Sequence, residues 1–204
     1  MPVVSFWVLL MGSATPPAPA AQSDPASVVF RIKTAKFVEA ARALARSPDD
    51  LPLTQPLAGD LVVAYAIELP GMFRMMNRAD LASFGLSLDA LHAVAVANVR
   101  RKVTPRVSTQ PPVLYIKTGD DLEACVLLLD EVWSALQPQV PGELVVLPVS
   151  RDILLITSST SSRGLQLARE VQVQAWNSDG DGTHRLSDKF LVRRGSKWEF
   201  FEQK

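Results

Sequence analysis

One stretch near the carboxyl end of the chain has the residue types and spacing of a calcium-binding loop. Its oxygen-bearing side chains fall at positions one, three, five and twelve of such a loop, and they are Asn177, Asp179, Asp181 and Asp188. Gly182 stands at position six, where the loop turns sharply, and hard oxygen ligands at this spacing can wrap a divalent cation. Calcium is therefore the candidate cofactor that this sequence offers.

The same residues also suit an ordinary turn between a helix and a strand. His184 stands where an apolar residue normally packs a calcium loop, and Asp188 is shorter than the usual bidentate glutamate. A strand is expected to follow, so the second helix of a helix–loop–helix frame is not expected. Because Asn, Asp and Gly are common turn residues, we favour the plain turn.

Arg151 and Asp152 form a second candidate site, at the tip of an expected hairpin. An arginine at this place can hold a carboxylate or phosphate group through two parallel hydrogen bonds. The structural alternative is that Asp152 accepts hydrogen bonds from nearby backbone amides, as aspartates in tight turns commonly do. We favour the turn and keep both residues as candidate ligand-binding groups.

The cysteine and the histidines give little support for nucleophilic or zinc chemistry. Cys125 is the single cysteine and lies in an apolar run, which is typical of a small buried side chain. A cysteine nucleophile or a zinc site would need histidine partners, and the two histidines, His92 and His184, are far apart in sequence. The sequence contains neither a glycine-rich phosphate loop nor a nucleophile elbow.

Acidic side chains could still perform acid–base catalysis, which has no short motif. The acidic groups at residues 120–123 and 130–131 single out no pair by their spacing, and placement at helix N-termini explains both. A carboxylate enzyme requires a pocket in which Arg151 and at least two carboxylates converge. A binding module would instead have an exposed apolar patch, or a groove without that convergence.

The elements that would position these groups are organised around one hairpin. Two apolar runs, residues 144–149 and 153–157, flank the polar corner at residues 150–152. Neither run alternates with polar residues, so both faces should be covered and the hairpin should be central in a sheet.

Further strands are expected at residues 60–69, 72–76, 113–117, 189–194 and 197–201, with an extended segment at 51–57. Helices are expected within residues 28–46 and at 78–84, 87–102, 130–137 and 161–176. Residues 103–112 are expected to form a connector inside one domain, and residues 122–129 suit either a buried strand or a helix. This pattern predicts an α+β fold, with a mostly antiparallel sheet and helices packed against it in a single domain.

Composition excludes several classes of partner. The 21 basic and 21 acidic residues cancel, and no basic stripe is interleaved with aromatic residues, so nucleic-acid binding has no support. The one basic run, residues 100–102, is expected to end a helix rather than to bind phosphate. No segment reaches the roughly 18 apolar residues of a membrane span.

The N-terminus resembles an export signal. Residues 3–11 are apolar, small and proline residues follow, and Ala18-Pro19-Ala20 provides a cleavage site. We therefore expect a signal peptide at 1–21, a linker at 22–27 and the folded domain at 28–204, in the periplasm or secreted. The segment before the apolar run has no Lys or Arg, so the alternative is a frayed apolar tail or an extra strand.

Several blocks of apolar and turn residues form one pattern along the chain, at residues 60–70, 80–81, 84–87, 123–133, 149–155, 186–187 and 191–194. This pattern resembles the YtpQ family, a bacterial family without an established activity. The resemblance spans roughly residues 28–200 and implies a YtpQ-like α+β domain. Many relatives look leaderless and cytoplasmic, so the cytoplasm is the alternative compartment.

These observations favour a non-catalytic binding or interaction module of the bacterial envelope, with a protein or small molecule as its partner. The alternative is a hydrolase or transferase that uses Arg151 and Asp or Glu residues, assisted by calcium. A third possibility is a cytoplasmic housekeeping protein, which requires that residues 1–21 are not cleaved.

Overall fold

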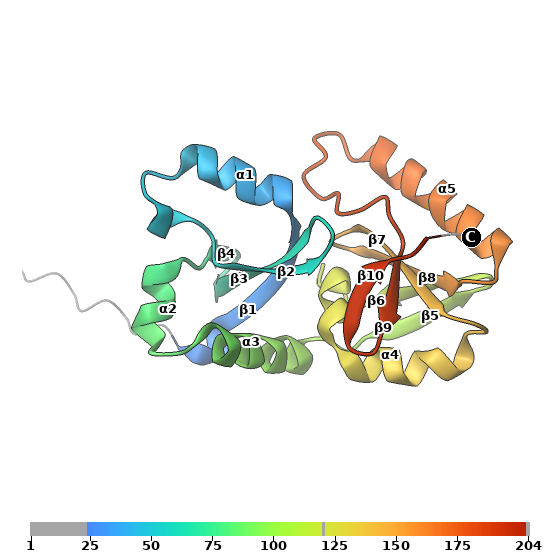
Figure 1. Cartoon of the computed structure of the whole chain (residues 1–204), viewed down its shortest axis with the longest axis horizontal. Coiled ribbons are helices and arrows are strands. Elements are labelled where there is room, and N and C mark those ends of the chain that lie inside the picture. Colours follow the sequence, from blue (N-terminus) through green and yellow to red (C-terminus); the bar gives the residue numbers. More distant parts are fainter. Residues whose placement is uncertain (1–23, 120, 203–204) are drawn as a thin grey trace, which may run out of the picture.

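A computed structural model of the chain describes residues 24–119 and 121–202, and it contains two antiparallel sheets that lie side by side (Figure 1). Helices pack against both sheets, which confirms the predicted α+β class. The first sheet comes from the N-terminal half of the chain and the second from the C-terminal half. The leader predicted at residues 1–21 lies outside the described residues.

The first sheet has the strand order β1-β3-β2, and β4 also pairs with β3. Its strands are β1 (Val28–Thr34), β2 (Thr54–Ala58), β3 (Leu61–Leu69) and β4 (Met72–Met75). The helices of this half are α1 (Ala35–Leu44), α2 (Arg78–Phe84) and α3 (Leu88–Lys102). The expected strands at 60–69 and 72–76, and the helices at 78–84 and 87–102, are therefore present with small shifts of their ends.

Strand β1 corrects one prediction. The first helix does fall within residues 28–46, but it begins at Ala35, and the seven residues before it form a strand. Phe30 and Ile32 are buried beside Tyr65, on the face that packs against α3. Because side chains alternate along a strand, Arg31 and Lys33 lie on the opposite face.

Helix α3 has the ends that its sequence predicts. The Ser87 hydroxyl accepts a hydrogen bond from the Ala90 amide at the N-terminus, and three cations occupy the last turn, where the helix dipole favours positive charge. The buried Asn98 side chain donates hydrogen bonds to the Pro25 and Val28 carbonyl oxygens, which joins the helix to the start of β1.

The second sheet has the strand order β10-β9-β7-β8-β6-β5. Its strands are β5 (Arg106–Gln110), β6 (Val113–Lys117), β7 (Leu144–Ser150), β8 (Ile153–Ser158), β9 (Leu191–Arg194) and β10 (Lys197–Phe200). Its helices are α4 (Asp130–Leu136) and α5 (Ser162–Ser178). Residues 103–112 were expected to be only a connector, and β5 corrects this.

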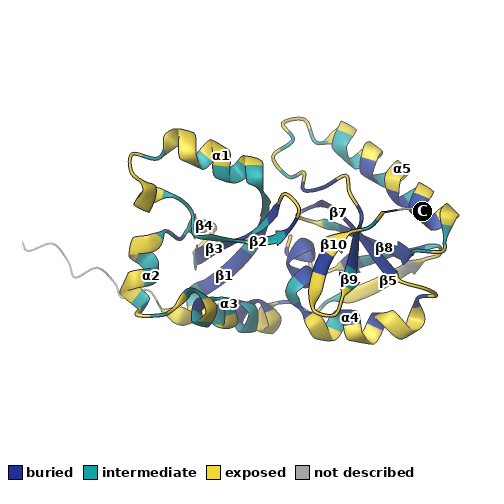
Figure 2. Ribbon diagram, in the orientation of Figure 1, coloured by how far each residue is buried: buried dark blue, intermediate teal, exposed yellow. Residues whose placement is uncertain are grey.

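The hairpin β7–β8 lies at the centre of this sheet and is covered on both faces, as predicted. Val145 and Leu147 pack in the cluster under α5, whereas Leu144 and Val146 belong to the core that the two sheets share. Figure 2 shows the central strands of both sheets in the colour of buried residues, with exposed residues on the outer helices.

The junction between the sheets is a 3₁₀ segment, η3 (Glu123–Leu128), in the stretch whose type the sequence left open. Cys125, Val126 and Leu127 within it are buried, and they belong to the same core cluster as residues of both sheets. The Cys125 thiol donates a hydrogen bond to the Phe30 carbonyl oxygen of β1 at 3.4 Å. The segment therefore joins the two halves of the molecule.

Among the described residues, each helix taken alone is too short or too polar to cross a membrane. The pair α2 and α3 meets the length and composition of a span only together, with a bend of 84° between the two helices.

We predict that Gly164→Ala destabilises the protein, although alanine normally favours a helix by about 1 kcal/mol. A Cβ at Gly164 would lie 2.0 Å from the Thr157 hydroxyl oxygen and 3.0 Å from the Pro112 carbonyl oxygen. The expected loss in the free energy of unfolding is about 1–3 kcal/mol, measured by urea denaturation. Gly180→Ala is the control, because its Cβ meets nothing within 4 Å. An equal stability for both variants would contradict this packing.

Candidate functional site

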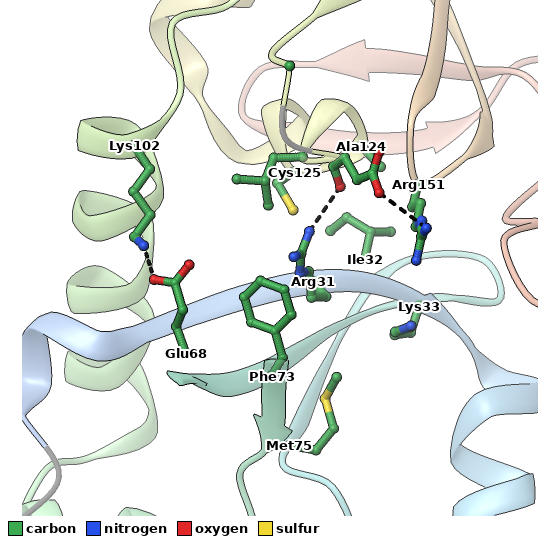
Figure 3. A pocket seen from close by; sticks show the side chains of 13 residues that line it. Arg31, Ile32, Lys33, Glu68, Phe73, Met75, Lys102, Ala124, Cys125 and Arg151 are labelled. Carbon is green, nitrogen blue, oxygen red and sulfur yellow. Dashed lines mark hydrogen bonds and ion pairs between the residues drawn. The ribbon is translucent and has the colours of Figure 1, made fainter. Parts of the chain in front are cut away.

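A pocket of about 670 Å³ lies between the two halves of the molecule, and we call it the inter-sheet pocket (Figure 3). Strands β1, β3 and β4 supply one side. Gly119, residues from 121 to 125 and the β7–β8 turn supply the other side, and the last residue of α3 closes one end. The described part of the chain contributes four cations to its lining, which are Arg31, Lys33, Lys102 and Arg151.

The alternation of β1 places two of these cations in the pocket. Phe30 and Ile32 face α3, so Arg31 and Lys33 project from the other face of the sheet. Ala64 stands opposite Arg31 in the β1–β3 register. Its small side chain leaves room for the arginine to lie across the sheet.

Arg31 is held at the centre of the pocket by contacts on two sides. Its guanidinium lies 3.8 Å from the centroid of the Phe73 ring, which is within the range of a cation–π interaction. Its Nη1 donates a hydrogen bond to the backbone oxygen of Asp121 at 2.9 Å. The arginine therefore bridges the floor of the pocket and the opposite wall (Figure 3).

Each carboxylate in the pocket lining is paired with a cation. Asp121 lies 3.1 Å from Arg151, from Oδ2 to Nη2, and Glu68 forms an ion pair with Lys102. Glu68 and Lys102 lie on one side of Arg31, and Arg151 lies on the other (Figure 3). The described lining thus contains Arg151 and two carboxylates, which are the groups that a carboxylate enzyme requires. Glu68, however, lies away from Arg151, so the two carboxylates do not converge with this arginine.

Lys33 differs from the other lysine of the pocket, because no described residue forms an ion pair with it. Its Nζ lies 5.3 Å from the centroid of the Phe37 ring. Burial lowers the pKa of Lys33, and the positive charges of Arg31 and Arg151 lower it further. The amine therefore lies in a pocket whose charge disfavours its protonated form.

Glu123 positions the wall of the pocket that contains Asp121. The residue is only 6% exposed, and its carboxylate accepts hydrogen bonds from the amides of Thr118 and Gly119, at 2.8 and 3.3 Å. Asp121 has a φ of +54°, in the left-handed region. These bonds hold Thr118 and Gly119 against Glu123, close to Asp121, whose backbone oxygen contacts Arg31 and whose side chain contacts Arg151.

The two residues at the tip of the β7–β8 hairpin have different surroundings. Arg151 lines the inter-sheet pocket, whereas Asp152 accepts a hydrogen bond from the Ser150 hydroxyl at 2.7 Å and is not part of the lining. The backbone of Arg151 is held by its neighbours, because its amide donates to the His184 carbonyl and its carbonyl accepts from the Ala124 amide.

In the candidate calcium loop, for which the sequence favours a plain turn, the described side chains have separate local partners. Asn177 lies in the last turn of α5, and the Asp179 carboxylate lies 3.6 Å from Arg185 and 3.8 Å from His184. Asp181 accepts hydrogen bonds from the amide and the hydroxyl of Thr183. Of the described residues, no three or more His, Cys, Asp or Glu side chains are grouped closely enough to hold a metal ion. The observed arrangement is that of a turn with local hydrogen bonds.

The cysteine and the histidines also lie apart from one another. His92 forms a hydrogen bond with the Tyr65 hydroxyl at 2.8 Å, and His184 faces Asp179, so neither contributes a hydrogen bond to Cys125 in the described structure. Burial raises the pKa of the Cys125 thiol to about 11. Cys125 is therefore a buried packing residue, as its sequence context indicates.

Sequence reasoning missed three of the four cations of the pocket. Arg31 and Lys33 alternate with buried apolar residues, and this period of two would have indicated a strand with a charged face. Lys102 was assigned only to the end of a helix, where it does lie.

Comparisons with protein-family models, with curated proteins and with solved structures find no match for this chain. The resemblance to the YtpQ family stays a prediction.

We predict that Cys125 reacts slowly with thiol reagents in the folded protein. Raising the thiol pKa from 9.0 to about 11 lowers the thiolate fraction at neutral pH by about a hundredfold, and burial blocks access as well. The rate of labelling should rise to that of a free thiol in guanidinium chloride. Because the chain has one cysteine, intact mass measures this rate directly. Native labelling as fast as denatured labelling would show that the site is open.

Proposed function

We propose that this chain is a non-catalytic binding module of the bacterial envelope, and that it binds a small anionic ligand in the inter-sheet pocket. The observation that supports this proposal is the charge of the lining, where four cations face two carboxylates in the described part of the chain. These cations come from three separate parts of the chain: β1, the end of α3 and the β7–β8 turn. Their meeting at one cavity suits a negatively charged ligand.

The shape and apolar lining of the pocket favour a small organic anion. Phe73 and Met75 of β4 supply apolar surface in the lining, and the Phe73 ring lies against the guanidinium of Arg31. A ligand with an apolar chain and one or more carboxylate or phosphate groups could contact both kinds of surface. The alternative, a carboxylate-based hydrolase or transferase, is less favoured because Glu68 and Asp121 each already face a cation.

We predict that the protein binds glutarate, and that Arg151→Gln weakens binding by about tenfold or more, because hydrogen bonds to charged groups contribute about 1.5–3 kcal/mol. Isothermal titration calorimetry at low ionic strength measures both dissociation constants, and added salt should weaken binding. Arg163→Gln is the matched control, since Arg163 is exposed on α5 and lies outside the pocket. Absence of binding at millimolar glutarate and at millimolar inorganic phosphate, or equal losses in both variants, would overturn the anion-binding proposal.

The envelope location rests on the leader-like sequence of residues 1–21. We predict that the full chain, expressed in bacteria, yields a periplasmic species that begins at Ala21 or Gln22. Intact mass of the periplasmic fraction measures this. The Leu9→Arg variant interrupts the apolar run and should keep the chain uncleaved in the cytoplasm. A wild-type chain that begins at Met1 or Pro2 in the cytoplasmic fraction would replace the envelope with the cytoplasm.

A further inference from the structure

Lys33 differs in its surroundings from the other three cations that support the proposed function. Arg31, Lys102 and Arg151 each contact an oxygen of the pocket wall or of its floor, whereas Lys33 has no hydrogen bond or ion pair to a described residue. Here the amine is half-buried, with two guanidinium groups close enough to act on it.

We propose that Lys33 binds a small 2-oxo acid covalently, as an imine between its Nζ and the ligand's carbonyl carbon. This inference rests on the proposed function, because the cations of the pocket must first hold the carboxylate. Arg151 is positioned for this by backbone hydrogen bonds on both sides of its residue. Lys33 and Arg151 both line the pocket and lie on the same side of Arg31 in Figure 3, and the charge of Arg151 acts on the amine.

The chemistry needs only groups that the pocket and the ligand provide. The neutral amine gives its electron pair to the carbonyl carbon, and a carbon–nitrogen bond forms. The carbonyl oxygen takes both protons of the nitrogen and leaves as water, so no oxidant or reductant is consumed. Lysines beside other cations and in apolar surroundings are used for this reaction because they lose their proton readily.

The charged groups around Lys33 favour the neutral amine that this step requires. Burial is the largest cause of its lowered pKa, and the charges of Arg31 and Arg151 act in the same direction. Cys125 acts in the opposite direction, but its own thiol stays protonated at neutral pH because its pKa is about 11. Addition of one water molecule to the imine reverses the reaction and releases the 2-oxo acid unchanged, so the module remains a binder.

The test is reductive trapping of the full-length protein with 2-oxoglutarate and sodium cyanoborohydride. The reduced adduct adds the mass of the acid minus one oxygen atom, and peptide mapping should place it on Lys33. Lys33→Arg keeps the positive charge and should abolish the adduct. Lys36→Arg removes an exposed lysine of α1 and should leave the adduct unchanged. Excess glutarate, which has no keto group, should suppress trapping by competition.

The outcomes separate this inference from the proposed function. Calorimetric binding of glutarate and 2-oxoglutarate without a trapped adduct would overturn the imine and leave the anion site intact. An adduct spread over exposed lysines, or one that persists in Lys33→Arg, would also overturn the imine. If neither acid binds, the imine fails, and if inorganic phosphate does not bind either, the anion site fails as well. A single adduct on Lys33 that glutarate suppresses would support both.

Discussion

A buried irregular segment between two sheets must have its backbone polar groups satisfied, and this constraint governs the structure. Each unpaired buried group would cost about 1–3 kcal/mol. In η3 the indole N–H of Trp133 donates to the Val126 carbonyl oxygen and that of Trp198 donates to the Leu127 carbonyl oxygen, at 2.9 and 2.8 Å. The two indole rings lie 5.0 Å apart in an edge-to-face contact. The tryptophans therefore join α4 and β10 to the segment that also contacts β1.

The inter-sheet pocket is a consequence of this junction. The start of η3 positions the pocket wall, because Glu123 binds two loop amides and the Ala124 amide binds the carbonyl of Arg151. Cys125 contacts β1 in the same turn of chain, which brings Arg31 against that wall. Cations from distant segments of the chain thus meet in the pocket between the two sheets. The packing of η3 against both sheets offsets the repulsion between these cations.

Local patterns predicted most of the elements but little of the candidate site. Hairpin β7–β8 and helix α3 are encoded by apolar runs and caps, and both were predicted near their observed ends. Strand β1 was missed because the sequence was interpreted as containing only a helix within residues 28–46. The η3 segment shows no hydrophobic periodicity, because nearly all of its residues are buried. Strand β5 was missed because it has the polar composition of a loop. The meeting of Arg31 with Phe73 and Asp121 depends on pairing across the sheet and on the junction, which no local pattern contains.

The cations of the pocket differ in their exposure to solvent, and this difference determines which of them would contribute most to the binding of an anion. The Arg151–Asp121 pair is about half-exposed on each side, at 46% and 55%, so it contributes only about 0–1 kcal/mol and exchanges readily. A ligand carboxylate can therefore replace Asp121 at Arg151 at little cost. Lys33 is less solvated and has no acidic partner among the described residues. An anion that pairs with its ammonium group, or an imine that replaces this group, would reduce its repulsion from the guanidinium groups of Arg31 and Arg151. This relief is available only to a ligand that reaches past the rim, which favours a small anion over an acidic surface of another protein.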